Sequence, residues 1–461
     1  MKVGEDPQTT GETRAVQISR LIAGMTGVLF LSACADPEVI LRGERLPLRA
    51  PVVDEVAEDT VEAEVAEEIA EIDTSFEMPA QVASSDWTHE AGNSSHRRDH
   101  AAFSSNPAQI WSVNIGQGNN RKHRITSDPV ISGGRIYVMD SQSRVSAVSN
   151  TGAVLWTRNL TPPEEREGDA SGGGVAIAGD TAFATTGFGE LIALDASTGA
   201  EKWRQRLDAP ATSAPTVVGD LVYAVSRDNV AWAIGASDGR VKWQLPGTPD
   251  VSGVIGGAAP AVNDRVAVFP FGSGELVAAL RNGGVRLWGS AVSGRRKSVA
   301  YANVTDITAD PVIVGDVVYT ASQSGRTVAI SMNSGARIWT ARDGATGPVM
   351  VAGTSLFMVS DQNELIRLNA ETGEEIWATE LPFFRRDTAR RARTIFTHFG
   401  PVLAGGQLWV ASDSGKLTSY DPETGEERQT LDIPGGAASS MSVADGTMYL
   451  LTGRGQLVAY R

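Results

Sequence analysis

The feature that most constrains this chain is a repeat of forty to fifty residues that begins at Asp128. Two copies show it clearly, because Pro215-Thr-Val-Val-Gly-Asp-Leu-Val-Tyr223 closely matches Pro311-Val-Ile-Val-Gly-Asp-Val-Val-Tyr319. Each copy continues through an alternating strand and a glycine-containing turn to a tryptophan. A period of this length is typical of propellers and other repeat arrays.

The tryptophan near the end of each copy marks the period. It recurs at intervals of 38 to 51 residues, at Trp156, Trp203, Trp243, Trp288, Trp339 and Trp377. Between these positions, short runs of Val, Ile, Leu and Tyr are separated by Gly-Asp, Ser-Gly or Thr-Gly pairs, which indicates β-hairpins. Gly or Asp interrupts nearly every ten residues, so no helical period is sustained. We interpret the tryptophans as structural residues packed between neighbouring blades and assign them no chemistry.

Counting the copies predicts the architecture. Seven copies occupy residues 128–160, 172–207, 213–245, 257–292, 309–344, 347–381 and 400–433, and residues 440–460 supply three further strands. The missing strand is expected at residues 109–113, where Trp111 lies one period before Trp156. The sequence therefore predicts an all-β, eight-bladed β-propeller whose N-terminal strand joins the C-terminal blade and removes its open edge. The seventh copy has Arg428 near the expected tryptophan position, so its packing should differ.

The N-terminus predicts export and lipid attachment. Arg14 and Arg20 precede an apolar run over residues 21–31, which is too short to span a bilayer and suits a signal peptide. Leu31-Ser-Ala-Cys34 follows, and Cys34 is the only cysteine in 461 residues. This resembles the lipobox of bacterial lipoproteins, so we expect Cys34 to be lipidated. Ala35, rather than Asp, follows the cysteine, which in such lipoproteins implies the periplasmic face of the outer membrane.

The segment after Cys34 carries most of the charge. Residues 51–80 contain eleven Asp or Glu and no Lys or Arg, so of the net charge of −15 only −4 remains for residues 81–461. Such a run of like charges favours a solvated tether, although Val and Ile at mostly helical spacing leave a docking helix as the alternative. We expect residues 1–33 to be the signal peptide, residues 34–85 an acidic flexible tether and residues 86–461 the propeller.

Several function classes are disfavoured by composition. The acidic balance argues against nucleic acid as a partner. His89, His96 and His100 lack regular ligand spacing, so we predict a solvated loop there and no metal site. No phosphate-binding loop or nucleophile elbow is present, so we assign no catalytic residue. Arginine-rich clusters near residues 121–124, 295–297 and 385–393 fall in loops and suit an acidic partner or anionic lipid.

The repeat resembles the PQQ-like, tryptophan-docking repeat shared by two families. In one, pyrroloquinoline quinone enzymes hold the cofactor against a disulfide of adjacent cysteines, which this chain cannot form with one cysteine. The other is the BamB family, lipoproteins of the outer-membrane β-barrel assembly (BAM) machinery. Residues 110–116 and the final strand 455–461 resemble the two ends of that family's propeller, and the lipobox and repeat number agree.

The BamB resemblance implies a scaffold without enzymatic activity or cofactor. It would bind the periplasmic domains of BamA through loops between blades, contact other assembly-complex subunits and aid insertion of unfolded outer-membrane proteins. Matching the flanking strands places Val254, Ile255 and Asp306 in those loops, although the family's arginine there is absent. The alternative is a propeller that binds a quinone or another small ligand in its channel, including a dehydrogenase-like enzyme.

Overall fold

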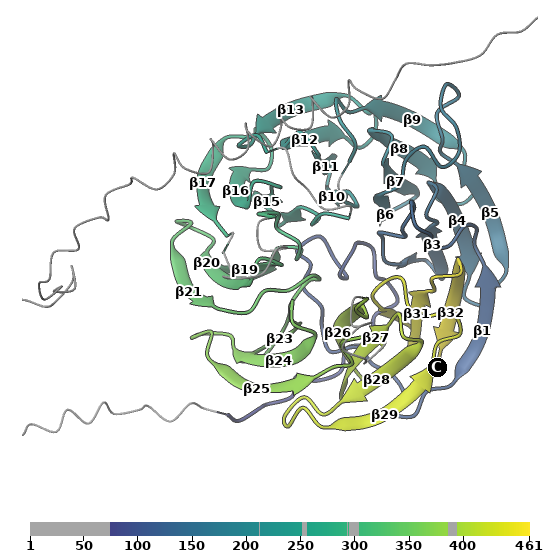
Figure 1. The fold of residues 1–461 in the computed structure, drawn as a ribbon. Helices are drawn as coiled ribbons and strands as arrows, with labels where there is room; N and C mark the ends of the chain where they lie inside the picture. The colour runs from purple at the N-terminus through teal and green to yellow at the C-terminus, as the bar shows by residue number, and fades with distance from the viewer. Residues whose placement is uncertain (1–73, 212, 251–255, 293, 295–303, 386–393) are drawn as a thin grey trace, which may run out of the picture. The chain divides into compact units, whose positions relative to one another are not determined.

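The computed structural model describes residues 74–461 except residues 212, 251–255, 293, 295–303 and 386–393. Every regular element in this described part is a β-strand, and the strands form eight four-stranded antiparallel sheets. Figure 1 shows the sheets arranged as blades around a ring. Within the same residues, no helix has the length and apolarity needed to cross a membrane. The predicted all-β, eight-bladed propeller is confirmed.

The strands follow the repeats in order, four to a blade. Blade 1 consists of β2 (Val130–Ser132), β3 (Arg135–Met139), β4 (Arg144–Ser149) and β5 (Val154–Asn159). Blade 2 consists of β6 (Gly173–Ala178), β7 (Thr181–Thr186), β8 (Glu190–Asp195) and β9 (Glu201–Arg206). Blade 3 consists of β10 (Thr216–Val218), β11 (Leu221–Ser226), β12 (Val230–Gly235) and β13 (Val241–Pro246). Blade 4 consists of β14 (Ala261–Val262), β15 (Val266–Pro270), β16 (Glu275–Leu280) and β17 (Arg286–Ala291).

The second half repeats this plan, and its last blade includes the N-terminal strand. Blade 5 consists of β18 (Val312–Val314), β19 (Val317–Ser322), β20 (Arg326–Ser331) and β21 (Arg337–Ala341). Blade 6 consists of β22 (Met350–Ala352), β23 (Ser355–Val359), β24 (Glu364–Asn369) and β25 (Glu375–Glu380). Blade 7 consists of β26 (His398–Ala404), β27 (Gln407–Ser412), β28 (Lys416–Tyr420) and β29 (Glu427–Asp432). Blade 8 consists of β30 (Ser442–Ala444), β31 (Thr447–Leu451), β32 (Gln456–Tyr460) and β1 (Gln109–Asn114).

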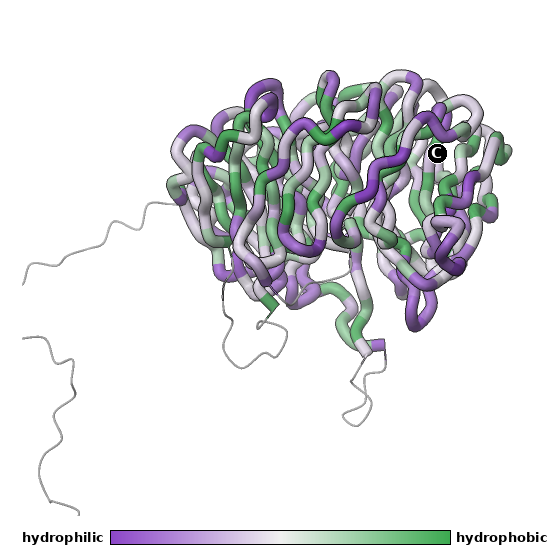
Figure 2. Tube along the Cα trace, turned by 90° about the horizontal axis from the view of Figure 1, so that it is seen from above, coloured by the Kyte–Doolittle hydropathy of each residue, from purple (hydrophilic) through white to green (hydrophobic). Residues whose placement is uncertain are grey.

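Burial differs between the inner and outer strands of a blade. In blade 3, every residue of β11 is buried, whereas β13 alternates between exposed and half-buried residues. The central strands are covered on both faces by neighbouring blades, which explains their continuous apolar runs. Figure 2 shows the ring from its side, with apolar segments concentrated in the strands and polar segments at the turns.

Adjacent blades are joined by a tryptophan that packs on a glycine. The indole of each terminal-strand tryptophan lies against the positive-φ glycine in the last turn of the next blade. The pairs are Trp111 with Gly152, Trp156 with Gly199, Trp203 with Gly239, Trp243 with Gly284, Trp288 with Gly335, Trp339 with Gly373 and Trp377 with Gly425. In all but the last pair, the indole N–H also donates to a backbone carbonyl of that turn, over 2.8–3.1 Å.

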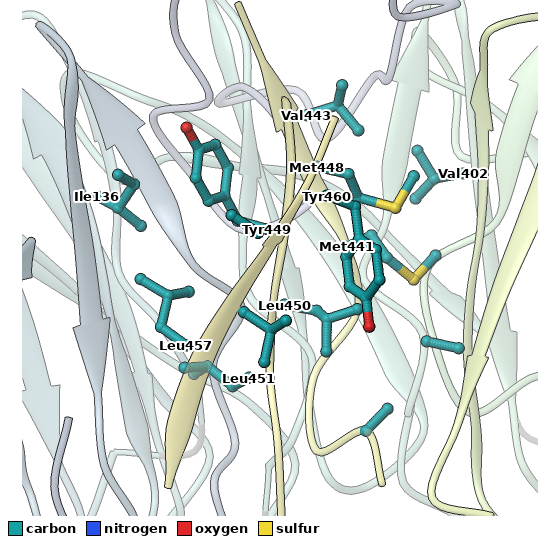
Figure 3. Close-up of a cluster of buried hydrophobic side chains, with 14 of the residues drawn as sticks. Ile136, Val402, Met441, Val443, Met448, Tyr449, Leu450, Leu451, Leu457 and Tyr460 are labelled. Atoms are coloured by element: carbon teal, nitrogen blue, oxygen red, sulfur yellow. The ribbon is translucent and has the colours of Figure 1, made fainter. Parts of the chain in front are cut away.

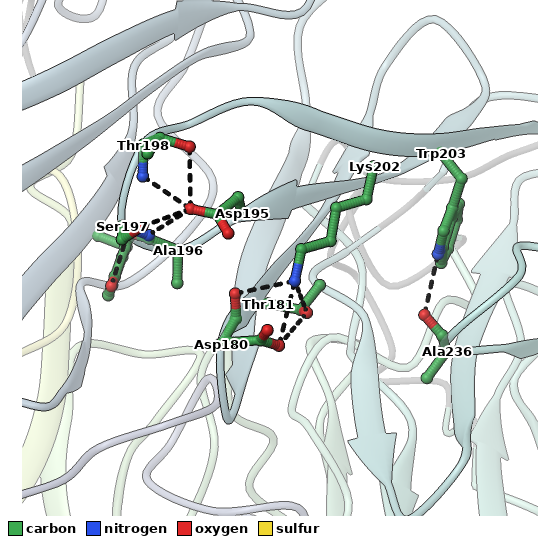
Figure 4. Close-up of polar contacts among 10 residues, drawn as sticks. Asp180, Thr181, Asp195, Ala196, Ser197, Thr198, Lys202, Trp203 and Ala236 are labelled. Atoms are coloured by element: carbon green, nitrogen blue, oxygen red, sulfur yellow. Dashed lines mark hydrogen bonds and ion pairs between the residues drawn. The ribbon is translucent and has the colours of Figure 1, made fainter.

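The sequence of the turn explains why glycine is needed there. Figure 4 shows Asp195 Oδ1 accepting hydrogen bonds from the backbone and hydroxyls of Ser197 and Thr198, which tightens the turn before Gly199. These hydrogen bonds, from Ser197 first, lower the pKa of Asp195 to about 2. The same figure shows the Trp203 indole donating to the carbonyl of Ala236 in the next blade, over 2.9 Å. The Asp-x-x-Thr-Gly motif thus builds a flat platform for the preceding blade's tryptophan.

The ring closes by pairing of the first strand of the propeller, β1, with the last, β32. Strand β1 pairs antiparallel with β32, with Ser112 opposite Val458. Ala108 and Arg461 exchange two backbone hydrogen bonds of 2.9 and 3.0 Å. Figure 3 shows the apolar cluster at this closure, where Ile136 of blade 1 and Val402 of blade 7 belong to the same cluster as blade 8 side chains. The predicted closure by residues 109–113 is confirmed.

The same closure accounts for the missing tryptophan of the seventh copy. In blade 2, Trp203 pairs with Ala193, and the equivalent pair in blade 7 is Gln429 with Ser419. Gln429, and not Arg428, therefore occupies the tryptophan position. Because the last two strands of blade 8, β32 and β1, are not joined by a turn, that blade offers no glycine platform. Gln429 Nε2 instead donates to the carbonyl of Ser105, over 2.5 Å, and to Gln407 Oε1, over 3.1 Å.

The glycine platform predicts a graded effect of adding one methyl group. In blade 5, a Cβ on Gly335 would lie 2.7 Å from the Trp288 ring, whereas a Cβ on Gly315 would meet nothing within 4 Å. Both glycines have positive φ, 71° and 57°, so alanine strains both turns. We expect Gly335→Ala to lower the free energy of unfolding by about 1–3 kcal/mol more than Gly315→Ala, measured by urea denaturation. Equal losses in the two variants would contradict the role of the platform.

Candidate functional site

The two faces of the ring differ in what they carry. Because strands alternate in direction, the turns after the first and third strands of each blade lie on one face, here called the turn face. The turns after the second strands and the connections between blades lie on the opposite face, here called the loop face.

Residues 74–104 form a strap along the channel side of the innermost strands, and Figure 1 shows it inside the ring. Its backbone bonds to successive blades. Trp87 exchanges hydrogen bonds of 2.8 and 2.7 Å with Ile131 of blade 1. Further backbone bonds join Thr88 to Ile177, Ser94 to Val262, Ser95 to Ile313, Ala101 to Leu403 and Ser84 to Asp445. The innermost strands have no neighbour on their channel side, so the strap pairs N–H groups that would otherwise be unpaired.

The strap's histidines His89, His96 and His100 are buried, so the prediction of a solvated loop is wrong. The N–H of Val217 in blade 3 donates to His89 Nε2, over 3.0 Å, and His96 Nδ1 lies 3.0 Å from the carbonyl of Pro311 in blade 5. Burial lowers the pKa of His89 to about 3 and that of His96 to about 4. His100 Nδ1 lies 2.7 Å from the carbonyl of Pro79, within the strap itself. Each ring joins different backbone groups rather than a common ligand.

The first residues of the strap contact blade 6. Phe76 packs edge-on against Phe357, with ring centroids 5.6 Å apart, and the guanidinium of Arg367 lies over the Phe76 ring. Arg367 Nη2 donates to the carbonyl of Ser75, over 2.7 Å. The expected boundary between tether and propeller, at residues 85 and 86, thus falls within a segment that contacts blades on both sides of it. Residues 1–73, with Cys34 and most of the acidic run, lie outside the described residues.

The channel inside the ring contains a well of about 650 Å³, which lies between the strap and the loop face. Its lining comes from the segments just before the innermost strands and from connections on the loop face, including Thr308, Thr346 and Ser440. Glu90 is the strap residue that lines it. The well therefore opens on the loop face and has the strap at its floor. Arg124, Arg385 and Asp413 lie among its lining residues.

Three carboxyl groups and one guanidinium gather around the floor. Asp128 Oδ1 accepts a hydrogen bond from the backbone N–H of Ser440, over 2.8 Å. Asp310 Oδ1 accepts one from the backbone N–H of Ala259, over 2.7 Å. Glu90 accepts the N–H of Ala214. Arg98 Nη1 donates to the carbonyl of Pro401, over 3.0 Å, and its positive charge acts on all three carboxyl groups.

Burial dominates the electrostatics of this floor. It raises the pKa of Asp128 and of Asp310 to about 6, despite the opposing charge of Arg98. Burial, followed by the negative charges of Asp310 and Asp128, raises the pKa of Glu90 well above its usual value. In the described part of the chain, no three His, Cys, Asp or Glu side chains are placed to hold a metal ion.

The sequence carries a signal for two of these carboxyls. Asp128 and Asp310 each precede a proline at the start of a blade, where blades 3 and 4 have Ala214-Pro and Ala259-Pro. An alignment of the repeats at this position distinguishes the two aspartates, which were not among the candidate site residues proposed from the sequence. No such signal identifies Glu90 or Arg98, because the strap lies outside the repeats and has no equivalent segment to compare with.

The loop residues predicted to contact a partner are only partly described. Val254 and Ile255 lie outside the described residues. Asp306 is buried, at 6% exposure, and its carbonyl accepts a hydrogen bond from Ser322, over 3.0 Å. Its neighbour Thr305 connects two loops, because its hydroxyl lies 2.9 Å from Asp250 Oδ2 and 3.1 Å from the carbonyl of Gly272.

A third connection on the loop face exposes apolar side chains. Between blades 6 and 7, Phe384 forms an antiparallel bridge with Ile395, and Arg385 N–H donates to the carbonyl of Thr394, over 2.8 Å. Phe383, Phe384 and Ile395 are 37%, 40% and 48% exposed. We call residues 382–385 with 394–396 the exposed hairpin. Only the arginines of this connection were identified from the sequence.

Comparison with known proteins identifies the family. The family model described as outer membrane protein assembly factor BamB matches residues 141–379 and 385–461. The chain belongs to the BamB family. BamB of Yersinia pestis is 24% identical over 362 residues, which cover 75% of this chain and 89% of that protein. BamB of Escherichia coli is 23% identical over 360 residues, with the same coverage of each chain.

Solved structures agree with the fold. The structure of BamB from Moraxella catarrhalis matches with a TM-score of 0.64 and 20% identity, covering 77% of this chain and all of that one. The quinohemoprotein alcohol dehydrogenase of Comamonas testosteroni matches with a TM-score of 0.63 and 15% identity, covering 82% and 81%. At these identities the structural likeness shows the propeller fold, which BamB proteins share with quinone enzymes.

The buried floor predicts a pH dependence of stability. Asp310→Asn keeps an oxygen to accept the Ala259 N–H but cannot ionise. The pKa of Asp310 rises from 3.8 to about 6 on folding, so its contribution to stability is present below about pH 4 and is lost as pH rises through 6. Between pH 4.5 and pH 8, the variant should therefore gain about 1–3 kcal/mol of unfolding free energy relative to the parent protein. Denaturant titrations at both pH values would measure it, and a pH-independent difference would contradict it.

Proposed function

We propose that this chain is a non-enzymatic scaffold lipoprotein of the outer-membrane β-barrel assembly machinery. The observation that carries the proposal is the match of the BamB family model over blades 2 to 7 and parts of blades 1 and 8. The chain is anchored through Cys34 on the periplasmic face of the outer membrane and binds the periplasmic domains of BamA. Through this complex it aids the folding and insertion of outer-membrane proteins.

We place the docking surface on the loop face. The exposed hairpin offers two phenylalanines and an isoleucine beside Arg385, and aromatic and arginine side chains dominate the energetics of many protein interfaces. Val254 and Ile255 belong to the connection between blades 3 and 4, whose flanking strands β13 and β14 meet the loop face, so we propose these two residues as further contacts. Because Asp306 is buried, we assign it the role of positioning its loop rather than of touching the partner.

Capture from solubilised envelopes tests the docking surface. Phe384→Glu places a charge on the exposed hairpin, and Ile338→Glu places one on a similarly exposed apolar residue of the outer strand β21. We expect the tagged parent protein and the Ile338 variant to recover BamA, and the Phe384 variant to recover at least several-fold less. Equal recovery by the two variants would remove the exposed hairpin from the interface. Failure of the parent protein to recover BamA would overturn the assembly role.

The anchor is tested separately. Cys34→Ala removes the thiol that would be acylated, so the protein should lose its acyl mass and move from the membrane to the soluble periplasmic fraction. The protein is expected to leave the membrane because stable anchoring requires more than one acyl chain. Fractionation measures the change of location, and mass spectrometry of the N-terminal peptide measures the loss of acyl mass. A parent protein without acyl mass on Cys34 would contradict the lipoprotein assignment while leaving the propeller's role open to the capture experiment.

A further inference from the structure

We propose that a cavity in the strap binds a neutral carbonyl group that carries a small apolar substituent, as an amide does. The cavity, here called the strap cavity, lies between two arms of the strap, residues 82–88 and 92–101, and the innermost strand β30 of blade 8. Its rim belongs to the turn face, because the carbonyl of Ser84 accepts from Asp445 and Asp86 accepts from Gly133, both in turns of that face. The inference goes beyond the assembly role, which concerns the loop face.

The strap cavity has apolar walls and the size of a small organic group. Its apolar lining consists of Val82, Trp87, Ala101 and Val443. Its volume of about 200 Å³ equals the space that roughly seven water molecules occupy in the liquid. A ligand group of about seven non-hydrogen atoms, apolar over part of its surface, would therefore fill it.

Three buried hydrogen-bond donors at the strap cavity have no acceptor. They are Trp87 Nε1, Arg98 Nε and Arg98 Nη2, none of which makes a hydrogen bond in the described structure. Trp87 is 5% exposed and Arg98 is 3% exposed, so neither side chain is open to bulk water. A Cβ on Gly92, which also lines the cavity, would lie 3.9 Å from Trp87 Cε2, the ring carbon bonded to Nε1, and 3.9 Å from Arg98 Cγ. Buried donors are nearly always paired, so these three indicate an acceptor that enters the cavity.

The unpartnered acceptors of the channel belong to a different cavity. Glu90 Oε2 and the hydroxyl of Ser440 are also buried and unpartnered, but both residues line the well. Trp87 and Arg98 line the strap cavity instead. The buried, unpartnered side-chain atoms around the strap cavity are therefore all donors.

The charges around the strap cavity favour a neutral acceptor over an anion. Its charged lining residues are Asp86, Arg97, Arg98 and Asp99. Their charges sum to zero, and Arg97 pairs with Asp99 over 3.5 Å. Behind Arg98 lie the three carboxyl groups of the floor, which already act on its positive charge. A carbonyl oxygen can accept from the indole and the guanidinium without adding charge to this set.

Titration of the purified full-length protein, followed by the NMR signal of the Trp87 indole N–H, tests the site. The probes share one branched apolar group and differ in the polar group: isovaleramide, isovalerate and isoamylamine. We expect isovaleramide to shift the Trp87 signal and to bind about tenfold more tightly than the anion or the amine, because the anion adds charge and the amine leaves the donors unpaired. N-acetyl-leucine methylamide distinguishes the source of the carbonyl. Its binding would identify a polypeptide segment, whereas binding of isovaleramide alone would identify a small free amide.

Matched variants locate the binding, which calorimetry measures. Trp87→Phe keeps an aromatic ring and removes the indole N–H, so isovaleramide should bind about tenfold more weakly. Val82→Trp covers the mouth of the strap cavity, whereas Val154→Trp changes an equally exposed residue of strand β5, at 45%. We expect Val82→Trp to lose binding and Val154→Trp to retain it. These two exposed positions keep the test decisive where Trp87→Phe does not fold.

Three results would overturn the proposal. They are failure of both amides to bind, equally tight binding of isovalerate or isoamylamine, and equal binding by folded Val82→Trp and Val154→Trp. The first would show that solvent alone pairs the three donors. BamA capture does not enter this test, so the strap cavity and the assembly role can fail separately.

Discussion

The packing of a tryptophan on the glycine of the next blade is the interaction on which this ring depends. A single blade is apolar on both faces and has no independent core, so its stability comes from its neighbours. The indole supplies a flat apolar surface and one hydrogen-bond donor, and the tight turn supplies a carbonyl and a backbone without a side chain. Repeating this contact from Trp111 to Trp377 fixes the spacing of successive blades. The connections on the loop face are then free to vary in length and composition.

The single junction without this contact lies between blade 7 and blade 8, the blade in which the first strand β1 pairs with the last strand β32. There, strand pairing between β1 and β32, the Gln429 side chain and a large apolar cluster replace the tryptophan and its platform. The closure therefore uses backbone hydrogen bonds and general apolar burial in place of a specific docking pair. The strap adds a second circular connection on the channel side, so the ring is held at its outer turns and at its inner strands.

The sequence was sufficient to predict the architecture of the ring but not the contacts made inside its channel. Blade number, strand order and closure follow from local signals, because the hairpins have their own turn residues and every blade except blade 7 has a docking tryptophan. The tryptophan position of the seventh copy was placed near Arg428, one residue before Gln429, because loops vary the spacing of the copies and the spacing alone does not fix a single residue. The burial of His96 and the role of Arg98 could not be predicted because their partners are backbone carbonyls more than two hundred residues away, which leave no pattern in the nearby sequence. Asp128 and Asp310 were detectable only by comparing equivalent positions across blades.

The strap also determines when the molecule can finish folding. Arg98 bonds to Pro401 across 303 residues, and Ser84 to Asp445 in the last blade, so the earliest structured residues to be synthesised contact some of the last. Individual blades can form as soon as their own hairpins are complete, but the channel cannot be closed on the turn face until nearly the whole chain is present. Contacts between residues so far apart in the sequence slow folding, because the chain loses the entropy of closing a long loop before the contacts stabilise it. The ring therefore closes only after the last strand, β32, is available to pair with β1.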